Sequence, residues 1–99
     1  MAGEKRVLTE VRAMVDSARQ EALVAGFEAL MSQPRPSGLL RTELLNVEGE
    51  WRIQSLWRDR ATLSAMRAST AEPAAPKLFR SVGAQPELRI LDVWASSDR

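Results

Sequence analysis

Histidine, cysteine and tyrosine are all absent from this sequence of 99 residues. The absence of cysteine excludes disulfides, a thiolate nucleophile and a zinc–thiolate site. The absence of histidine removes the usual near-neutral acid or base and the commonest metal ligand. Any catalysis must therefore use carboxylates, arginines, small hydroxyl or amide side chains, tryptophan or the substrate's own reactivity. We expect no bound metal ion and no cofactor.

An excess of one charge is also missing, because 14 basic residues stand against 13 acidic ones and the net charge is +1. A nucleic-acid-binding surface needs a basic excess, so nucleic acid is not an expected partner. No apolar run approaches the roughly 18 residues of a membrane-spanning helix. The stretch 1–6 lacks the apolar core of a signal peptide. These observations predict a cytoplasmic protein that contacts no membrane.

The length suits a single domain over residues 1–99, with its core in 5–94. Apolar residues alternate over 5–13, which predicts a strand. Residues 16–32 begin with the N-cap residue types Asp and Ser and then carry apolar residues at helical spacing, which predicts a helix. Two prolines and a glycine predict a loop over 33–38.

The clearest local signal is a hairpin formed by residues 39–47 and 50–58. Glu48 and Gly49, between two alternating runs, are typical of a two-residue turn. Such a turn pairs Thr42 with Ser55 on a mostly apolar face, and the same register places Leu40 opposite Trp57. Arginine suits protein interfaces. We therefore expect a homodimer through the opposite, amphipathic face, which would carry Leu39, Arg41, Leu45, Arg52, Leu56 and Arg58.

Three further elements complete the pattern. Asp59 is a plausible N-cap for a helix over 60–69. Pro76 suits the first position of a short helix closed by Gly83. Residues 88–94 predict a last strand. The order β-α-β-β-α-(α)-β is that of the ferredoxin-like α+β fold, with a four-stranded antiparallel sheet.

Polar and aromatic residues on the apolar faces are candidates for a functional site, and each has a structural alternative. Trp57 is either a pocket wall that stacks on an aromatic ring or a core residue that seals a strand–helix corner. Thr42 and Ser55 either bind a ligand or simply pair across the strands, and Asn46 either joins them or lies exposed near the turn. Asp92 is either a buried general base with a raised pKa or a surface charge.

Apolar side chains near these residues either line a cavity between sheet and helices or fill the core. The predicted substrate site consists of Trp57, Trp51, Thr42, Ser55, Phe27, Met66 and Phe79. Trp57, Asn46 and Asp92 are the candidates for a catalytic role.

Several of these motifs together resemble the antibiotic biosynthesis monooxygenase family. They are the run 37–40, the pair Trp51 and Trp57, the sequence 57–59 leading into a helix with Met66 and Ser69, and Leu78-Phe79 followed by Val82-Gly83. The resemblance covers about residues 5–94. It implies a ferredoxin-like fold that pairs with a second copy as a dimeric α+β barrel. It also implies the oxidation of aromatic, polyketide-like phenols by molecular oxygen without metal or flavin.

Residue by residue, Trp57 matches the tryptophan implicated in the oxygenase members of that family. Ile53 and Leu63 stand where those members can carry an asparagine and a tyrosine. The haem-degrading branch needs a histidine ligand, which this chain lacks. The resemblance thus implies a cofactor-independent monooxygenase. The two diverged positions favour the alternative, a non-catalytic dimeric ligand-binding or accessory protein of the same fold. A third interpretation is a stress-linked protein with no small ligand, which a sheet–helix gap filled by side chains would favour.

Overall fold

The computed structural model describes residues 5–97. Its strands are β1 (Val7–Met14), β2 (Leu39–Val47), β3 (Glu50–Trp57) and β4 (Glu87–Asp92), and its helices are η1 (Ser17–Arg19, a 3-10 turn), α1 (Gln20–Met31), α2 (Arg60–Ala68) and α3 (Ala74–Ser81). This order confirms the predicted ferredoxin-like pattern. The predicted domain 1–99 includes residues 1–4 and 98–99, which lie outside the described residues.

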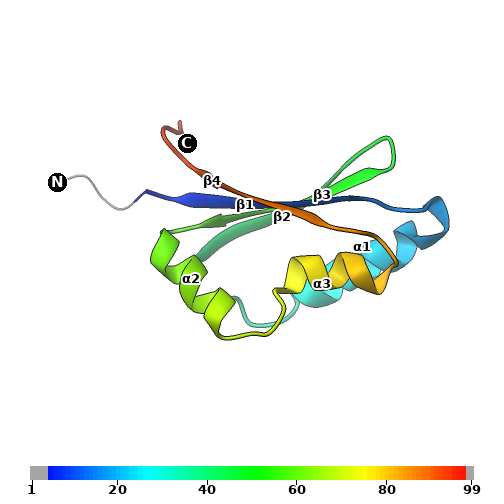
Figure 1. Ribbon diagram of the computed structural model, residues 1–99, viewed down its shortest axis with the longest axis horizontal. Coiled ribbons are helices and arrows are strands. Elements are labelled where there is room, and N and C mark those ends of the chain that lie inside the picture. The colour runs from blue at the N-terminus through cyan, green and yellow to red at the C-terminus, as the bar shows by residue number, and fades with distance from the viewer. Residues whose placement is uncertain (1–4, 98–99) are drawn as a thin grey trace.

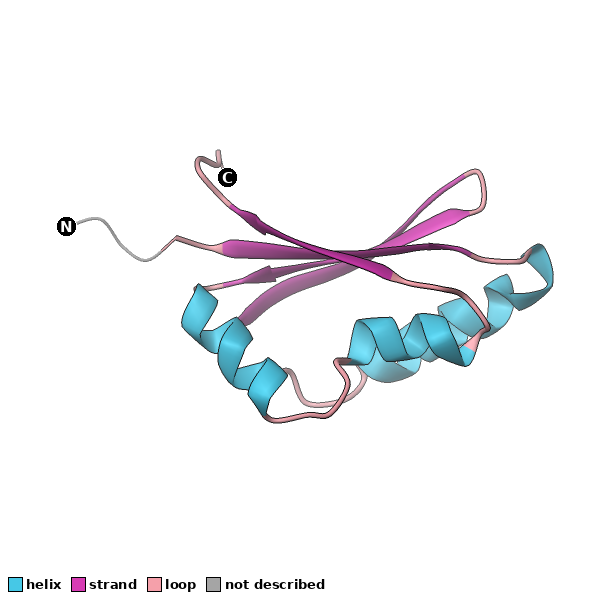
Figure 2. Ribbon diagram, viewed as in Figure 1, coloured by secondary structure: helices cyan, strands magenta, loops and turns pink. Residues whose placement is uncertain are grey.

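The four strands form one antiparallel sheet in the order β2-β3-β1-β4. All three α-helices lie against the same side of this sheet (Figure 1). Figure 2 shows the resulting two layers, with the strands above and the helices below. We call the helix-covered side the inner face and the other side the open face. No helix formed by residues 5–97 is both long and apolar enough to cross a membrane, and the cytoplasmic location stays a prediction.

The β2–β3 hairpin follows the predicted register over most of its length. Glu48 and Gly49 both have positive φ, 48° and 86°, as a tight two-residue turn requires. Thr42 lies opposite Ser55, as predicted, but the register shifts at Leu40. This bulge inserts one extra residue in β2 and reverses the side-chain parity beyond it. Leu39, rather than Leu40, therefore lies opposite Trp57, and the prediction of Leu39 on the open face is wrong.

The helices begin where local capping chemistry places them. The Asp59 carboxylate accepts a hydrogen bond of 2.8 Å from the Thr62 N–H, which confirms Asp59 as the N-cap of α2. The prediction that Pro76 opens α3 is wrong, because this helix begins at Ala74 with Pro73 as its N-cap. Proline is tolerated at the third helical position because N–H groups of the first turn have no helical acceptor.

The apolar core is divided into two clusters. The larger one packs under α1 and α3 and consists of Val11, Ala13, Val15, Leu23, Ile53, Phe79 and Val82. The smaller one consists of Val7, Trp57 and Leu63 and packs under α2. In Figure 1, α2 lies over one end of the sheet, while α1 and α3 lie over the other. The helical layer is therefore divided in two at the middle of the inner face, with α2 on one side and α1 and α3 on the other.

Candidate functional site

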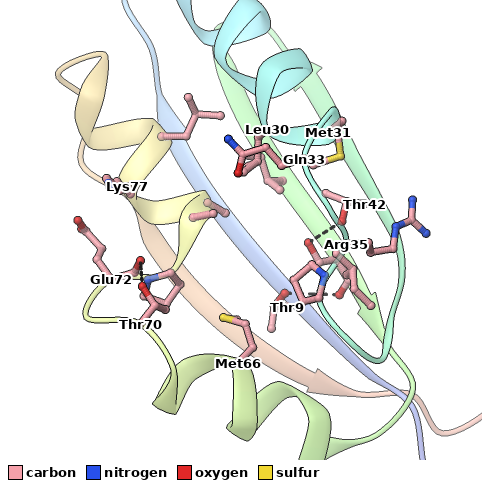
Figure 3. Close-up of a pocket in the computed structure, with 18 of the residues that line it drawn as sticks. Thr9, Leu30, Met31, Gln33, Arg35, Thr42, Met66, Thr70, Glu72 and Lys77 are labelled. Atoms are coloured by element: carbon pink, nitrogen blue, oxygen red, sulfur yellow. Dashed lines mark hydrogen bonds between the residues drawn. The ribbon is translucent and has the colours of Figure 1, made fainter.

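A cavity of about 600 Å³ lies between sheet and helices at this split. Residues of β1, β2 and β3 form its floor, and residues of α1, α2 and α3 form its walls (Figure 3). The loops 33–36 and 69–73 border it and contribute exposed side chains such as Arg35 and Thr70, so the cavity opens to solvent. Its volume falls in the range of ~300–1,000 Å³ that is typical of small-molecule sites.

Apolar side chains make up most of the cavity walls. Leu30 comes from α1, Met66 from α2 and Leu78 from α3, while Ile53 and Trp57 come from the sheet. An apolar lining with a few polar groups is the usual composition of a site for a small organic molecule.

The polar groups of the floor form one line across the sheet, which we call the hydroxyl row: Thr42, Ser55 and Thr9. These residues lie directly opposite one another on β2, β3 and β1. Thr42 Oγ1 lies 3.3 Å from Ser55 Oγ, and Thr9 Oγ1 donates to the Ser55 carbonyl oxygen over 3.4 Å. Trp57 Nε1 donates to Thr9 Oγ1 over 3.3 Å. The hydroxyl row thus also fixes the indole of Trp57.

The cavity brings together four of the residues predicted for a substrate site: Trp57, Thr42, Ser55 and Met66. The other three, Phe27, Phe79 and Trp51, belong to the larger core cluster or pack against it, and they do not line the cavity. Phe79 is fully buried as the anchor of α3. Trp51 Nε1 is buried and has no hydrogen-bond partner among residues 5–97.

Two of the three candidates for a catalytic role lie outside the cavity. The Asn46 side chain is exposed near the turn and donates to the Glu50 carbonyl oxygen over 3.3 Å. The Asp92 side chain is 48% exposed and accepts a hydrogen bond of 2.7 Å from Arg60. The structure therefore selects the exposed alternative for both residues, and Asp92 is not a buried general base.

Acidic and basic groups occur at the rim of the cavity rather than on its floor. Glu72 is engaged by an ion pair with Arg80, and Arg35 donates to the Leu40 carbonyl oxygen over 2.9 Å. Within the described part of the chain, no group of three or more carboxylates is placed to hold a metal ion. The cavity can therefore enclose and orient an apolar molecule, but its floor supplies no strong acid or base.

Thr9 is the functional candidate that sequence reasoning missed. Its parity with Val7 and Val11 places it on the inner face, and that signal is present in the sequence. Its position beside Ser55 depends on the pairing of β1 with β3, which are separated by a helix and a further strand.

A buried carboxylate lies at the centre of the open face. Glu10 is 4% exposed and accepts hydrogen bonds from Arg52, Gln54 and Arg89 over 3.0–3.1 Å. Burial alone would raise the pKa of Glu10. The hydrogen bonds from Arg89 and Gln54, with the charges of Arg52 and Arg89, outweigh burial and hold the pKa below its ordinary value of 4.5. The pKa of Arg52 is raised, chiefly by its hydrogen bond to Glu50.

The stability lost on replacing Glu10 should depend on pH in a defined direction. A lowered pKa in the folded state contributes stability above the unfolded-state pKa, and this contribution is lost as pH falls through the folded-state pKa. We expect Glu10→Gln to lower the free energy of unfolding by about 1–2 kcal/mol at pH 7. The difference from the parent protein should shrink as the pH falls below 4.5.

Urea unfolding followed by tryptophan fluorescence between pH 3 and pH 7 measures this difference. Glu43→Gln is the matched control, because Glu43 also lies on a sheet strand but forms an exposed ion pair of 3.6 Å with Arg41. Such surface pairs contribute ~0–1 kcal/mol. An equal loss of stability in both variants at every pH would contradict the assignment of Glu10.

Comparison with known proteins finds likeness in structure rather than in sequence. No protein-family model and no curated protein matches the sequence. A variant of SnoaB, a cofactor-independent oxygenase from Streptomyces nogalater, superimposes with a TM-score of 0.64 and 18% identity, over 92% of this chain and 95% of that one.

Two further solved structures show the same arrangement. A candidate antibiotic biosynthesis monooxygenase from Caulobacter crescentus has a TM-score of 0.70 and 14% identity, over 93% of this chain and 92% of that one. The haem-degrading protein Rv3592 from Mycobacterium tuberculosis has a TM-score of 0.71 and 17% identity, over 98% and 100%. At these identities the likeness establishes the fold. The chain therefore has the α+β fold of structures described as antibiotic biosynthesis monooxygenases.

Proposed function

We propose that this chain is a cofactor-independent monooxygenase that binds a hydrophobic, aromatic, polyketide-like small molecule in the cavity. The observation that carries the proposal is an apolar cavity of about 600 Å³ beside Trp57, in a fold shared with a cofactor-independent oxygenase. Trp57 is 4% exposed and packs in the smaller core cluster, so it would offer a flat substrate only the small part of its indole that lines the cavity. The hydroxyl row holds that indole in place through Thr9.

The cavity's composition restricts the chemistry. Its floor carries no acid or base, so the substrate must itself have an acidic C–H bond, as anthrones do. The substrate carbanion would give electrons to molecular oxygen, and the balanced reaction is R₂CH₂ + O₂ → R₂C=O + H₂O. One oxygen atom becomes the ketone, and the other leaves as water with the two hydrogens of the methylene group. The protein would contribute positioning in a mostly apolar cavity.

Oxygen consumption with anthrone as substrate tests this proposal. We expect a rate above that of the uncatalysed oxidation, saturation with anthrone, and a stoichiometry of one oxygen molecule per anthrone. No acceleration with a panel of anthrones and hydroquinones would exclude the oxygenase. Binding of these compounds without conversion would assign the cavity to the non-catalytic alternative.

We also propose that a second copy of the chain covers the open face, as in a dimeric α+β barrel. No helix of residues 5–97 packs on this face, although leucines lie on it beside the charges that surround Glu10. Leu45 and Leu91 are 38% and 37% exposed. Glutamate and arginine follow one another along strands of this face, as Glu10 and Arg12 do on β1 and Glu87 and Arg89 on β4. A surface with both charges can be self-complementary about a two-fold axis. Arg41, Arg52, Leu56 and Arg58 stay predicted interface residues.

The dimer proposal predicts a particle of twice the chain mass of 11.0 kDa at micromolar concentration. Leu45→Glu should weaken self-association about tenfold or more, because it would bury an unpaired charge between two leucine-bearing faces. Ala61→Glu, an exposed position on α2, is the control and should leave the mass unchanged. Light scattering measures both. A parent protein that is monomeric in this concentration range would refute the dimer.

A further inference from the structure

The hydroxyl row contains one more hydrogen than its protein acceptors use. Thr9, Ser55 and Thr42 carry one hydroxyl hydrogen each. The Thr9 hydrogen is used on the Ser55 carbonyl oxygen, and one hydrogen is used between Thr42 Oγ1 and Ser55 Oγ. Whichever of these two hydroxyls donates to the other, the remaining hydrogen has no acceptor among residues 5–97. The Thr42–Ser55 pair therefore keeps one unused hydrogen-bond donor.

The surroundings of this pair allow the unused donor to affect which ligand binds in the cavity. Ser55 is only 8% exposed, and both residues line the cavity. Their neighbours along β3 on the same face are Ile53 and Trp57, so no other polar side chain of that strand's inner face adjoins them. Because the cavity opens to solvent, water can accept this hydrogen when no ligand is bound, and an apolar ligand that displaces water leaves the donor unpaired at a cost in free energy. A ligand that supplies an acceptor avoids that cost.

Thr9 cannot supply the same function. Its oxygen already accepts from Trp57 Nε1, and its hydrogen is already donated to the Ser55 carbonyl oxygen. The two cations that line the cavity, Arg35 and Lys77, are both exposed and lie on the loop 33–36 and on α3, so they belong to the rim and not to the floor. The donor available on the cavity floor is thus confined to the Thr42–Ser55 pair.

We infer that the Thr42–Ser55 pair is a subsite for a single acceptor oxygen, and that the natural ligand carries a carbonyl oxygen on an otherwise apolar body. This inference rests on the proposed function, since it assumes that the cavity takes up a small organic molecule. The carbonyl oxygen would lie on the floor over β2 and β3, with the apolar body between Leu30 of α1 and Met66 of α2 (Figure 3).

A pair of probes that differ by one oxygen isolates this contact. Indane and indanone are nearly flat bicyclic molecules of almost the same shape. Indanone differs from indane only in that one CH₂ group of the five-membered ring is a C=O group. Their dissociation constants can be measured by titrating the amide resonances of the isotope-labelled full chain. The ratio of the two constants, compared between the parent and a variant, cancels the different cost of removing each probe from water.

The variant Thr42→Val/Ser55→Ala removes both hydroxyls while keeping the side chains close in size, a replacement that is often nearly neutral for stability. We expect it to weaken indanone binding about three- to tenfold, as the loss of one net hydrogen bond implies, and to leave indane binding within about twofold. Ser64→Ala, an exposed hydroxyl on α2 outside the cavity, is the control and should change neither constant.

The single variant Ser55→Ala gives a second test of the subsite, through the ratio of the two dissociation constants. In Ser55→Ala the Thr42 hydroxyl loses its partner and becomes free to donate to the ligand, so the preference for indanone should largely persist. The infrared C=O stretch of indanone bound to the parent protein needs no variant. It should lie below its value in an apolar solvent, because hydrogen bonding weakens the C=O bond.

The outcomes separate the two proposals. If neither probe perturbs resonances of cavity residues, the small-molecule site itself is refuted, and the subsite with it. If both probes bind the cavity with the same ratio in the parent and the double variant, or if the C=O stretch is unshifted, the carbonyl subsite alone is overturned and the apolar site stands.

Discussion

Gly38→Ala should lower the free energy of unfolding by about 2–4 kcal/mol, the sum of a left-handed backbone conformation and an overpacked contact. Gly38 has φ of +84°, which side chains other than glycine rarely tolerate. A Cβ atom there would also lie 2.4 Å from the Cβ of Thr62 in the first turn of α2. Gly38 further accepts a hydrogen bond of 2.8 Å from the Arg58 N–H, so the loop 33–38 cannot shift freely away from α2.

Gly83→Ala is the matched control for this substitution. Gly83 has a similar φ of +78°, but a Cβ atom there would meet nothing within 4 Å. It should therefore cost only the conformational term of about 1–2 kcal/mol. Thermal unfolding followed by circular dichroism should place Gly38→Ala about 10–20 °C below the parent, with Gly83→Ala in between. Equal losses in the two variants would mean that the contact between Gly38 and Thr62 is not tight.

Narrowing the cavity should lower the activity about 100-fold without unfolding the chain. Leu30→Trp/Met66→Trp extends one indole from α1 and another from α2 toward each other across the cavity. Misplacement of a substrate by ~1 Å can cost about 100-fold in rate, and we expect a loss of that order in anthrone-dependent oxygen consumption. Thermal stability should change little, because both new side chains enter an existing space.

Leu40→Trp/Ala65→Trp is the control, since it adds the same two indoles at exposed positions that do not line the cavity. This control should retain the activity of the parent. If the narrowed variant keeps full activity, the reaction takes place elsewhere on the molecule. If the control loses as much activity as the narrowed variant, the loss reflects added tryptophan rather than the cavity.

Local signals predicted those parts of the fold that depend on neighbouring residues. Glu48 and Gly49 fixed the hairpin register, and with it the pairing of Thr42 with Ser55. Asp59 marked the start of α2 because its carboxylate caps a residue three positions later. Each of these features lies within about a dozen residues of the chain, where spacing and turn chemistry determine the geometry.

Features that depend on distant contacts were not predictable. The bulge at Leu40 has no local signal, because Leu39 and Leu40 are both apolar and either could face the helices. Asp92 lies at the end of the edge strand β4, within reach of Arg60 of α2, and the position of Thr9 depends on the pairing of β1 with β3. The cavity itself results from the separation of α2 from α1 and α3, a distance that no pattern in the sequence encodes.

A crystal structure of the chain grown with anthraquinone, the unreactive product-like ketone of the anthrone series, tests the central claim most directly. We predict electron density for its ring system in the cavity beside the Trp57 indole, with one carbonyl oxygen at the Thr42–Ser55 pair. Density for the compound only on the open face or another surface, with the cavity closed by side chains or filled by water, would contradict the account.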